Sequence, residues 1–209
     1  MPDIFELLNS DLGKQLITKT GNEAGISSEQ TSEVLSMALP ALMGAMQQNA
    51  TSAQGAQSLL GALTSKHDGS ILDNLGDLFQ GGVNSDVLQD GSGILGHILG
   101  GKQTAIENGI SKKTGISSQQ IAQILKIAAP ILMGYLGKQA KEKNVSTTDG
   151  LGGLLEGLGG GSKGGSLLTS LLDADGDGSI IDDVAGMVLG GNNKKSTAGS
   201  LLGSLFKKK

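Results

Sequence analysis

The chain has 209 residues and a net charge of −4, which is long enough for one sizeable hydrophobic core or two smaller ones. It lacks cysteine, which excludes disulfides, thiol catalysis and cysteine-based zinc sites. All sixteen cationic residues are Lys, and the absence of Arg disfavours the bidentate recognition of phosphate or guanine that nucleic-acid binding often uses.

The composition also predicts the fold class. Aromatic residues make up 2% of the chain, whereas Leu, Ile, Ala and Met are plentiful, so the core must be aliphatic. Alternating runs of Val, Thr and aromatic residues, which are typical of strands, are missing. We therefore predict an all-α fold.

The start of the chain bears on its location. MPDIFELLNS carries an acid where a secretory signal has Lys or Arg, and no continuous apolar segment follows. The longest strongly apolar stretch, from Val34 to Met46, is shorter than the roughly 20 residues of a membrane-spanning helix. We expect a soluble cytoplasmic protein without a transmembrane segment, and export stays open.

Two pairs of related segments predict an internal duplication. Residues 25–44 and 115–134 are identical at eleven of twenty positions, at an offset of 90. DGSILDN at 68–74 and DGSIIDD at 177–183 are identical at five of seven positions, at an offset of 109. The larger offset indicates a Gly/Ser-rich insertion in the second copy.

Both copies carry the same signals for a helix end and a new helix start. Gly25 and Gly115 are expected to end a helix in the left-handed conformation that residues with a Cβ resist. Ser27 and Ser117 are then followed three residues later by Gln, which is the spacing of a capping box. A second helix should therefore start almost immediately in each copy.

The helices that follow, at about 28–47 and 118–140, are apolar nearly all round and are predicted to be the buried core helices. Pro40 and Pro130 stand in their middles. Because proline removes a backbone hydrogen bond and clashes with the preceding turn, we expect a kink or break at both.

We divide the chain into two tandem, related multihelical units. Each comprises a helix, a turn, a core helix, a Leu-rich helix, a DGS loop and a short helix. The first unit covers residues 1–89 and the second residues 90–191. The second contains the Gly/Ser-rich insertion at 145–165, which we interpret as a flexible linker, and an acidic loop at 173–183. A Lys-ended tail at 192–209 follows.

The acidic loop, DADGDGSIIDD, is the strongest candidate site. Three carboxylates at alternate positions followed by Gly match the start of a calcium loop, in which oxygen ligands surround the ion and Gly permits a sharp turn. Val184 stands where the closing bidentate carboxylate belongs, so a nearby acid or water must complete the shell. The alternative is a polar turn that caps the next helix. The predicted Ca2+ ligands are Asp173, Asp175, Asp177, Ser179 through its carbonyl, Asp182 and Asp183.

The matching position in the first copy holds a cation. Lys66 corresponds to Asp175 at the offset of 109. We hypothesise that its ammonium group replaces the ion and pairs with Asp68 and Asp73.

No catalytic or cofactor-binding residue is predicted. His97 lies among Ile, Leu and Gly residues, which is typical of a hydrogen-bonded packing role. A hydrolase that uses His97 with nearby carboxylates is the weakest alternative. The Gly-rich runs lack the preceding strand and the spacing of a phosphate loop.

Two further segments suggest partners. The Gly turns between helices resemble a helix-turn-helix, so a DNA- or nucleoid-binding regulator is the alternative function, although the missing Arg and the acidic Glu29 and Glu33 count against it. In the tail, Leu201, Leu202, Leu205 and Phe206 share one side of a short helix that ends in three Lys. Docking of the tail onto the protein itself is favoured over weak contact with a membrane surface.

The pattern GISS…P…LMG, the segment DGSGILGHILGG at 90–101 and the run LLDADGDGSIIDD resemble the bacterial family of unknown function that includes YidB. The resemblance covers nearly the whole chain and implies a multihelical bacterial protein. It brings no assigned reaction or catalytic residue. We therefore predict a non-enzymatic interaction or assembly module, with a protein partner or a second copy of itself, whose second unit is stabilised by calcium.

Overall fold

The computed structural model describes residues 4–79, 81–159 and 169–171, and in these residues the only regular elements are helices. The all-α prediction is therefore confirmed for the described part of the chain. In chain order the elements are α1 (Ile4–Asn9), α2 (Asp11–Ala24), α3 (Ser28–Ala50), α4 (Ala53–Ser65), α5 (Ser70–Asp73), α6 (Leu75–Leu78), α7 (Ser85–Leu99), the 3-10 helix η1 (Gly100–Lys102), α8 (Gln103–Thr114), α9 (Ser118–Glu142) and α10 (Thr148–Leu158).

The long central helices α3 and α9 start at the serines that the sequence indicated. The Ser27 hydroxyl accepts a hydrogen bond from the Gln30 backbone N–H at 3.2 Å, and the Gln30 side chain accepts one from the Ser27 N–H at 3.1 Å. This completes a capping box. The Ser117 hydroxyl accepts from the Gln120 backbone N–H at 3.3 Å. The Gln120 side-chain oxygen accepts from the Ser117 hydroxyl at 2.7 Å instead of from the Ser117 backbone N–H, so the second bond of a capping box does not form.

The predicted turns before these helices occur, whereas the predicted breaks at the prolines within them do not. Gly25 and Gly115 follow α2 and α8 with φ of 68° and 73°, as predicted. Both α3 and α9 continue through Pro40 and Pro130, so the breaks that we considered do not occur. Burial of the segments around both prolines explains why the helices tolerate them, since packing outweighs the lost hydrogen bonds.

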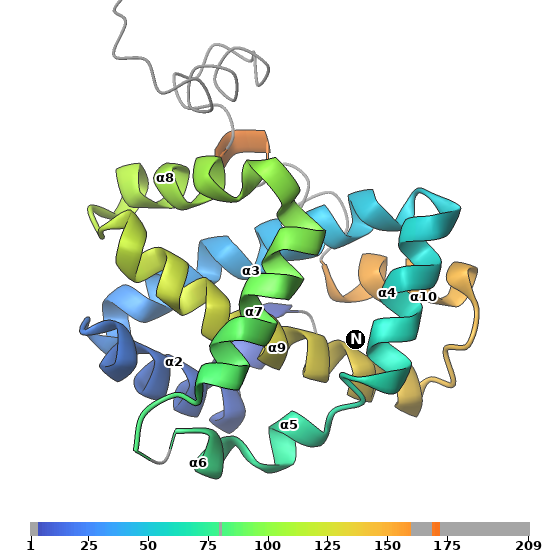
Figure 1. Cartoon of the computed structure of the whole chain (residues 1–209), viewed down its shortest axis with the longest axis horizontal. Helices are drawn as coiled ribbons and strands as arrows, with labels where there is room; N and C mark the ends of the chain where they lie inside the picture. Colours follow the sequence, from blue (N-terminus) through green and yellow to red (C-terminus); the bar gives the residue numbers. More distant parts are fainter. Residues whose placement is uncertain (1–3, 80, 160–168, 172–209) are drawn as a thin grey trace, which may run out of the picture.

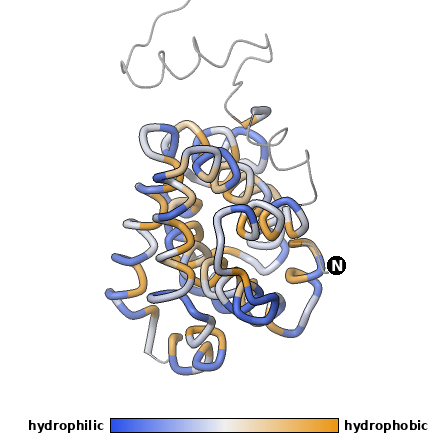
Figure 2. The backbone as a smooth tube through the Cα atoms, turned by 90° about the vertical axis from the view of Figure 1, so that its right-hand side faces the viewer, coloured by the Kyte–Doolittle hydropathy of each residue, from blue (hydrophilic) through white to orange (hydrophobic). Residues whose placement is uncertain are grey.

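The other helices surround α3 and α9 (Figure 1). Helix α2 packs against both α3 and α9, as does α8. Helix α7 crosses α9, while α4 and α10 pack together on α3 at the end away from α2. Figure 2 shows hydrophobic and hydrophilic residues alternating along most outer helices, as expected when one side of each faces the core.

One continuous core joins the two sequence copies. The buried side chains from Ile4 to Leu171 form a single cluster. Side chains of α9 also bond to the end of α2, since Gln120 and Gln123 donate to the carbonyls of Ala24 and Glu23 at 3.2 and 2.9 Å. The division that we placed between residues 89 and 90 lies within α7. The duplication itself stays a prediction from the sequence.

The inserted segment is the main difference from the predicted secondary structure. Over residues 148–158 it forms α10 instead of a flexible linker, and its four leucines are buried. The Gln47 side chain of α3 donates to the Leu155 carbonyl at 2.9 Å. Each of the four glycines in α10 lowers the stability of the helix by about 1 kcal/mol relative to alanine. Burial of each of the four leucines stabilises the folded helix by about 1.5–3 kcal/mol, so burial outweighs the low helix propensity of glycine.

Helix α9 is the one described helix that is long and apolar enough to cross a membrane, by length and composition. In the structure, 72% of its most apolar window is buried inside the protein. Its apolar character is therefore accounted for by its place in the core.

Candidate binding cleft between helices α4 and α7

A cleft of about 670 Å³ separates α4 from α7 and contains both histidines of the chain. Both helices pack on α3 and α9, which form the floor. Each wall is one helical face, with residues three or four positions apart. The α4 wall consists of Gly55, Ser58, Leu59 and Ala62, and the α7 wall of Asp90, Gly93, Ile94, His97 and Ile98.

The cleft is mainly apolar. Met46 of α3 and Met133 of α9 lie on its floor, and Leu59 and Ile94 contribute the large apolar side chains of the walls. Several other wall residues are small, so the walls leave space between them. A Cβ added at Gly93 would meet no atom within 4 Å. The cleft therefore has room for apolar groups from outside.

One end of the cleft is charged. The Lys66 ammonium group, at the end of α4, forms a short ion pair with Asp90 of α7. The second carboxylate oxygen of Asp90 lies 3.8 Å from Nε2 of His67. Lys66 and Asp90 thus link the two walls at this end.

His67 is buried, with 7% of its surface exposed. Burial lowers the pKa of its imidazole; Asp90 acts in the opposite direction, and Lys66 lowers the pKa further. His67 is therefore uncharged at neutral pH, and its contact with Asp90 is not an ion pair under those conditions.

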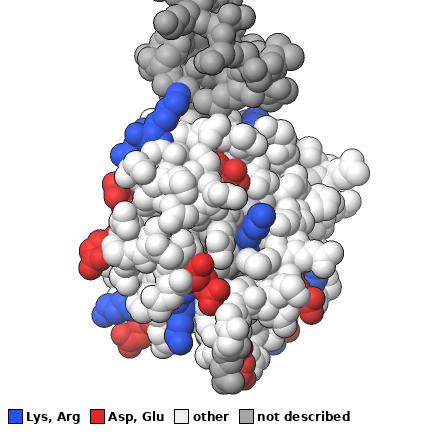
Figure 3. Space-filling model, turned by 60° about the vertical axis from the view of Figure 1, so that its left-hand side comes forward, with Lys and Arg blue, Asp and Glu red and all other residues white. Residues whose placement is uncertain are grey.

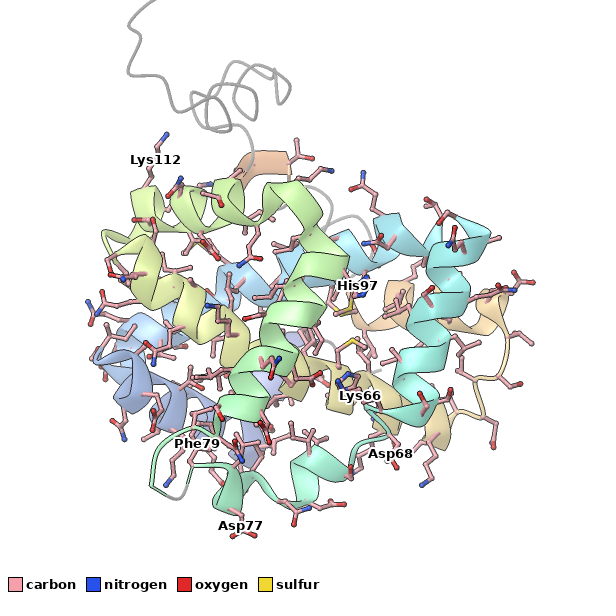
Figure 4. The ribbon with its side chains drawn as sticks, viewed as in Figure 1. Lys66, Asp68, Asp77, Phe79, His97 and Lys112 are labelled. Carbon is pink, nitrogen blue, oxygen red and sulfur yellow. The ribbon has the colours of Figure 1, made fainter. Side chains whose placement is uncertain are left out.

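The hypothesis that Lys66 pairs with Asp68 and Asp73 is wrong. Past His67, the chain turns at Gly69 (φ 103°), and the Asp68 carboxylate accepts a hydrogen bond from the Ser70 backbone N–H at 3.1 Å. That bond lowers the pKa of Asp68 and commits this carboxylate to the start of α5. Lys66 lies on the other side of the turn and reaches across the cleft instead (Figure 4).

The packing role that we expected for His97 is also wrong. Its neighbours Ile94 and Leu95 are buried, but His97 is exposed and lines the cleft two turns beyond Asp90. Figure 4 shows His97 and Lys66 at different levels of the space between α7 and α4. His97 is thus available to a bound molecule.

The predicted calcium ligands, Asp173, Asp175, Asp177, Ser179, Asp182 and Asp183, lie outside the described residues, as does the tail at 192–209. Within residues 4–79, 81–159 and 169–171, no group of three His, Asp or Glu side chains could hold a metal ion. The described segment nearest to the loop is docked on α8: Leu171 is buried, and the Lys113 ammonium group donates to the Ser170 hydroxyl at 2.9 Å.

The face shown in Figure 3 does not present a continuous basic surface. Lysines and acidic residues are scattered there and separated by wide uncharged areas. Glu29 is in the first turn of α3, the helix that a helix-turn-helix would present to DNA. This arrangement does not favour the DNA-binding alternative.

Sequence reasoning missed the cleft as a site. The signal that could have indicated it is the single helical face formed by Asp90, Gly93, His97 and Ile98, which combines polar, small and apolar residues. Such a face is typical neither of a buried helix nor of a fully solvated one.

Comparison with known protein families gives a match over most of the described chain. The sequence profile of DUF937, described as a bacterial protein of unknown function, matches residues 6–139. This range includes α2 to α8, most of α9 and all the residues named above for the cleft. Searches of curated proteins and of solved structures found no significant match.

Proposed function

Because the chain belongs to the DUF937 family of bacterial proteins of unknown function, whose description assigns no activity, we propose a function from the cleft itself. The protein is a non-enzymatic interaction module whose cleft between α4 and α7 binds an amphipathic helix of a partner protein. The observation that carries this proposal is an open, mainly apolar cleft with helical walls and a charged end.

The dimensions of the walls suit a helix. Helices α4 and α7 have 13 and 15 residues. At 1.5 Å per residue each wall is roughly 20 Å long, which is the length of a helix of about four turns. A helix between them would complete a layer on α3 and α9 and would bury its apolar side on the floor, in the manner of helix-in-groove recognition.

The chemistry of the lining agrees with this ligand. The thioethers of Met46 and Met133 are flexible and polarisable, which allows them to adapt to side chains of different shape. The ion pair of Lys66 with Asp90 offers polar contacts at one end, and His97 offers a further polar group along the α7 wall. An apolar stripe with polar flanks is therefore favoured over a wholly apolar ligand.

The non-enzymatic part of the proposal has separate support. His67 Nε2 and Asp90 are 3.8 Å apart, which is longer than the hydrogen bond by which a carboxylate orients a catalytic imidazole. The pKa of His67 is moreover lowered mainly by burial. This pair fits a structural role at the end of the cleft.

Calcium remains part of the proposal for the second half of the chain. The spacing of acids in DADGDGSIIDD suits a hard cation, and Leu171 is anchored on α8 two residues before Asp173. A bound ion would then stabilise the segment that follows Leu171 without taking part in the cleft.

The test uses a fluorescent synthetic amphipathic helix of about four turns with one leucine stripe, titrated against the full chain and followed by anisotropy. Gly93 lines the cleft and a Cβ there would meet no atom within 4 Å, so the larger side chain of the Gly93→Leu variant should lower binding at least tenfold. Gly96→Leu is the matched control: a Cβ there also meets no atom within 4 Å, but Gly96 does not line the cleft. Equal affinity of all three proteins would refute the proposal.

A further inference from the structure

We propose that the first occupant of the cleft is the chain's own C-terminal tail, with Leu201, Leu202, Leu205 and Phe206 on the floor between α4 and α7. This inference rests on the proposed function, because it uses the same cleft, and it adds a competitor that a partner helix must displace.

The tail can reach the cleft. Leu171, the last described residue, is buried against α8, where a Cβ added at Gly109 would meet the Leu171 carbonyl oxygen at 2.3 Å. Leu201 follows thirty residues later. Such a segment can extend to about 100 Å, whereas a compact domain of this size is only roughly 40 Å across. Every part of the surface, including the cleft, is within reach.

The apolar side of the tail matches the cleft. On a helix, the four large residues at 201, 202, 205 and 206 share one side, since they are separated by one, four and five positions. The large apolar residues that line the floor and walls include Met46, Met133, Leu59 and Ile94, each with at most 9% of its surface exposed. Between residues 196 and 204 the other residues of the tail are small (Ala, Gly, Ser and Thr), which fits the narrow space between two helical walls.

The charges give the tail a direction. Asp86 lies one turn before Asp90 on the same face of α7, is exposed and makes no ion pair within the described part of the chain. Asp68 borders the same end but is close enough to Lys141 for that ammonium to act on its pKa. The three lysines at 207–209 would therefore lie toward Asp86, with Leu201 toward His97.

Tethering strengthens the contact. A segment joined to its binding site by a linker of this kind faces an effective concentration on the order of millimolar, so even a weak contact is occupied in the isolated chain. A partner helix then binds only by displacing the tail.

The test places one spin label in the tail of the otherwise full chain. The protein lacks cysteine, so Ser204→Cys gives a single labelling site. We expect strong paramagnetic broadening of the Gly55 and Gly93 amide signals in the cleft. The Gly93→Leu variant should remove the broadening at Gly55, and Gly96→Leu should retain it. Absence of broadening at Gly55, or broadening that Gly93→Leu leaves unchanged, would overturn the inference.

A mixed sample separates contact within one chain from contact between chains. When spin-labelled chains without nitrogen-15 are mixed with unlabelled nitrogen-15 chains, the inference predicts no broadening at Gly55 and Gly93. Broadening in the mixture as strong as in the singly labelled chain would show that the tail binds a second copy, which contradicts the proposal as stated.

The leucine-striped peptide distinguishes this inference from the proposed function. If the tail occupies the cleft, the double variant Leu205→Ser, Phe206→Ser should bind the peptide at least fivefold more tightly than the wild type. Equal affinity would overturn the tail contact and leave the binding module intact. If the spin label in the tail broadens the Gly55 signal but neither protein binds the peptide, the proposed binding of a partner helix is wrong and the docking of the tail is supported.

Discussion

Three glycines of α7 allow a sharp test of how this helix is placed. A Cβ added at Gly91 would lie 1.8 Å from the carbonyl oxygen of Lys126 on α9. At Gly93 and Gly96 an added Cβ would meet no atom within 4 Å. The same substitution, Gly→Ala, should therefore destabilise the protein at the first position and stabilise it at the other two.

The magnitudes follow from these distances. Ordinary Cβ contacts are 3.4 Å or longer, so Gly91→Ala requires α7 and α9 to separate by about 1.6 Å. Overpacking of this kind costs about 2 kcal/mol or more, because the clash is with backbone. Alanine at 93 or 96 gains about 0.5–1 kcal/mol of helix propensity. The difference of about 3 kcal/mol corresponds to roughly 6–12 °C in Tm for a chain of this length.

The assay is unfolding by heat and by urea, followed by far-ultraviolet circular dichroism of the three single variants and the wild type. We expect the stability order Gly93→Ala and Gly96→Ala, then wild type, then Gly91→Ala. If Gly91→Ala were as stable as Gly93→Ala, the packing of α7 on α9 through Gly91 would be wrong, and so would the wall that α7 gives to the cleft.

Four other changes have defined outcomes. Ser27→Ala removes the acceptor of the capping box and should lower the free energy of unfolding by about 1 kcal/mol in urea melts; an unchanged value would contradict the capping role. Thr20→Val should raise the free energy of unfolding by about 1 kcal/mol, because the Thr20 hydroxyl is buried without a hydrogen-bond partner in the described structure. A loss of stability in this variant would show that the hydroxyl does have a hydrogen-bond partner. Burial lowers the pKa of His67 below its ordinary value of 6.5, so the unfolded state takes up the proton more readily than the folded state. The stability of the protein should therefore fall as the pH drops through the window just below 6.5. His67→Gln should flatten this part of the pH profile of Tm, and an equally steep profile in the variant would contradict the role of His67. Calcium added to chelator-treated protein should raise Tm, and the Asp175→Ala variant should not show this increase. If calcium gave neither a heat of binding nor a shift in Tm, the acidic loop would be a polar turn that caps a helix and not a calcium site.

The parts of the fold that depend on neighbouring residues could be predicted from the sequence. Gly25 and Ser27 end one helix and start the next through contacts within four residues, and the same is true of Gly115 and Ser117. The core helices were also predictable, since their apolar character extends round most of the helix. Their ends differ from the expected bounds by no more than three residues.

Helix α10 could not be recognised by the same means, because its leucines are interspersed with glycine. Gly content alone suggested a linker, whereas the structure shows that the face of Leu151, Leu154, Leu155 and Leu158 finds partners on α3 and α4. Tertiary burial overrode the local preference.

The cleft could not be predicted because its parts are distant in the chain. Lys66 and Asp90 are 24 residues apart and meet only because α4 and α7 both pack on α9. The sequence instead favoured Asp68, which is two residues from Lys66, as its partner. The apolar sequence neighbours of His97 likewise favour a place in the core, but its position on α7 directs it to the cleft.

The binding of an amphipathic helix in the cleft is tested most directly by amide NMR of the nitrogen-15-labelled full chain during titration with the leucine-striped peptide. Gly55 and Gly93 line the cleft, whereas Gly61 of α4 and Gly96 of α7 belong to the same helices but do not line it. The account predicts that the amide signals of Gly55 and Gly93 shift with the peptide and that those of Gly61 and Gly96 stay in place. Shifts at Gly61 and Gly96 without shifts at Gly55 and Gly93 would contradict it.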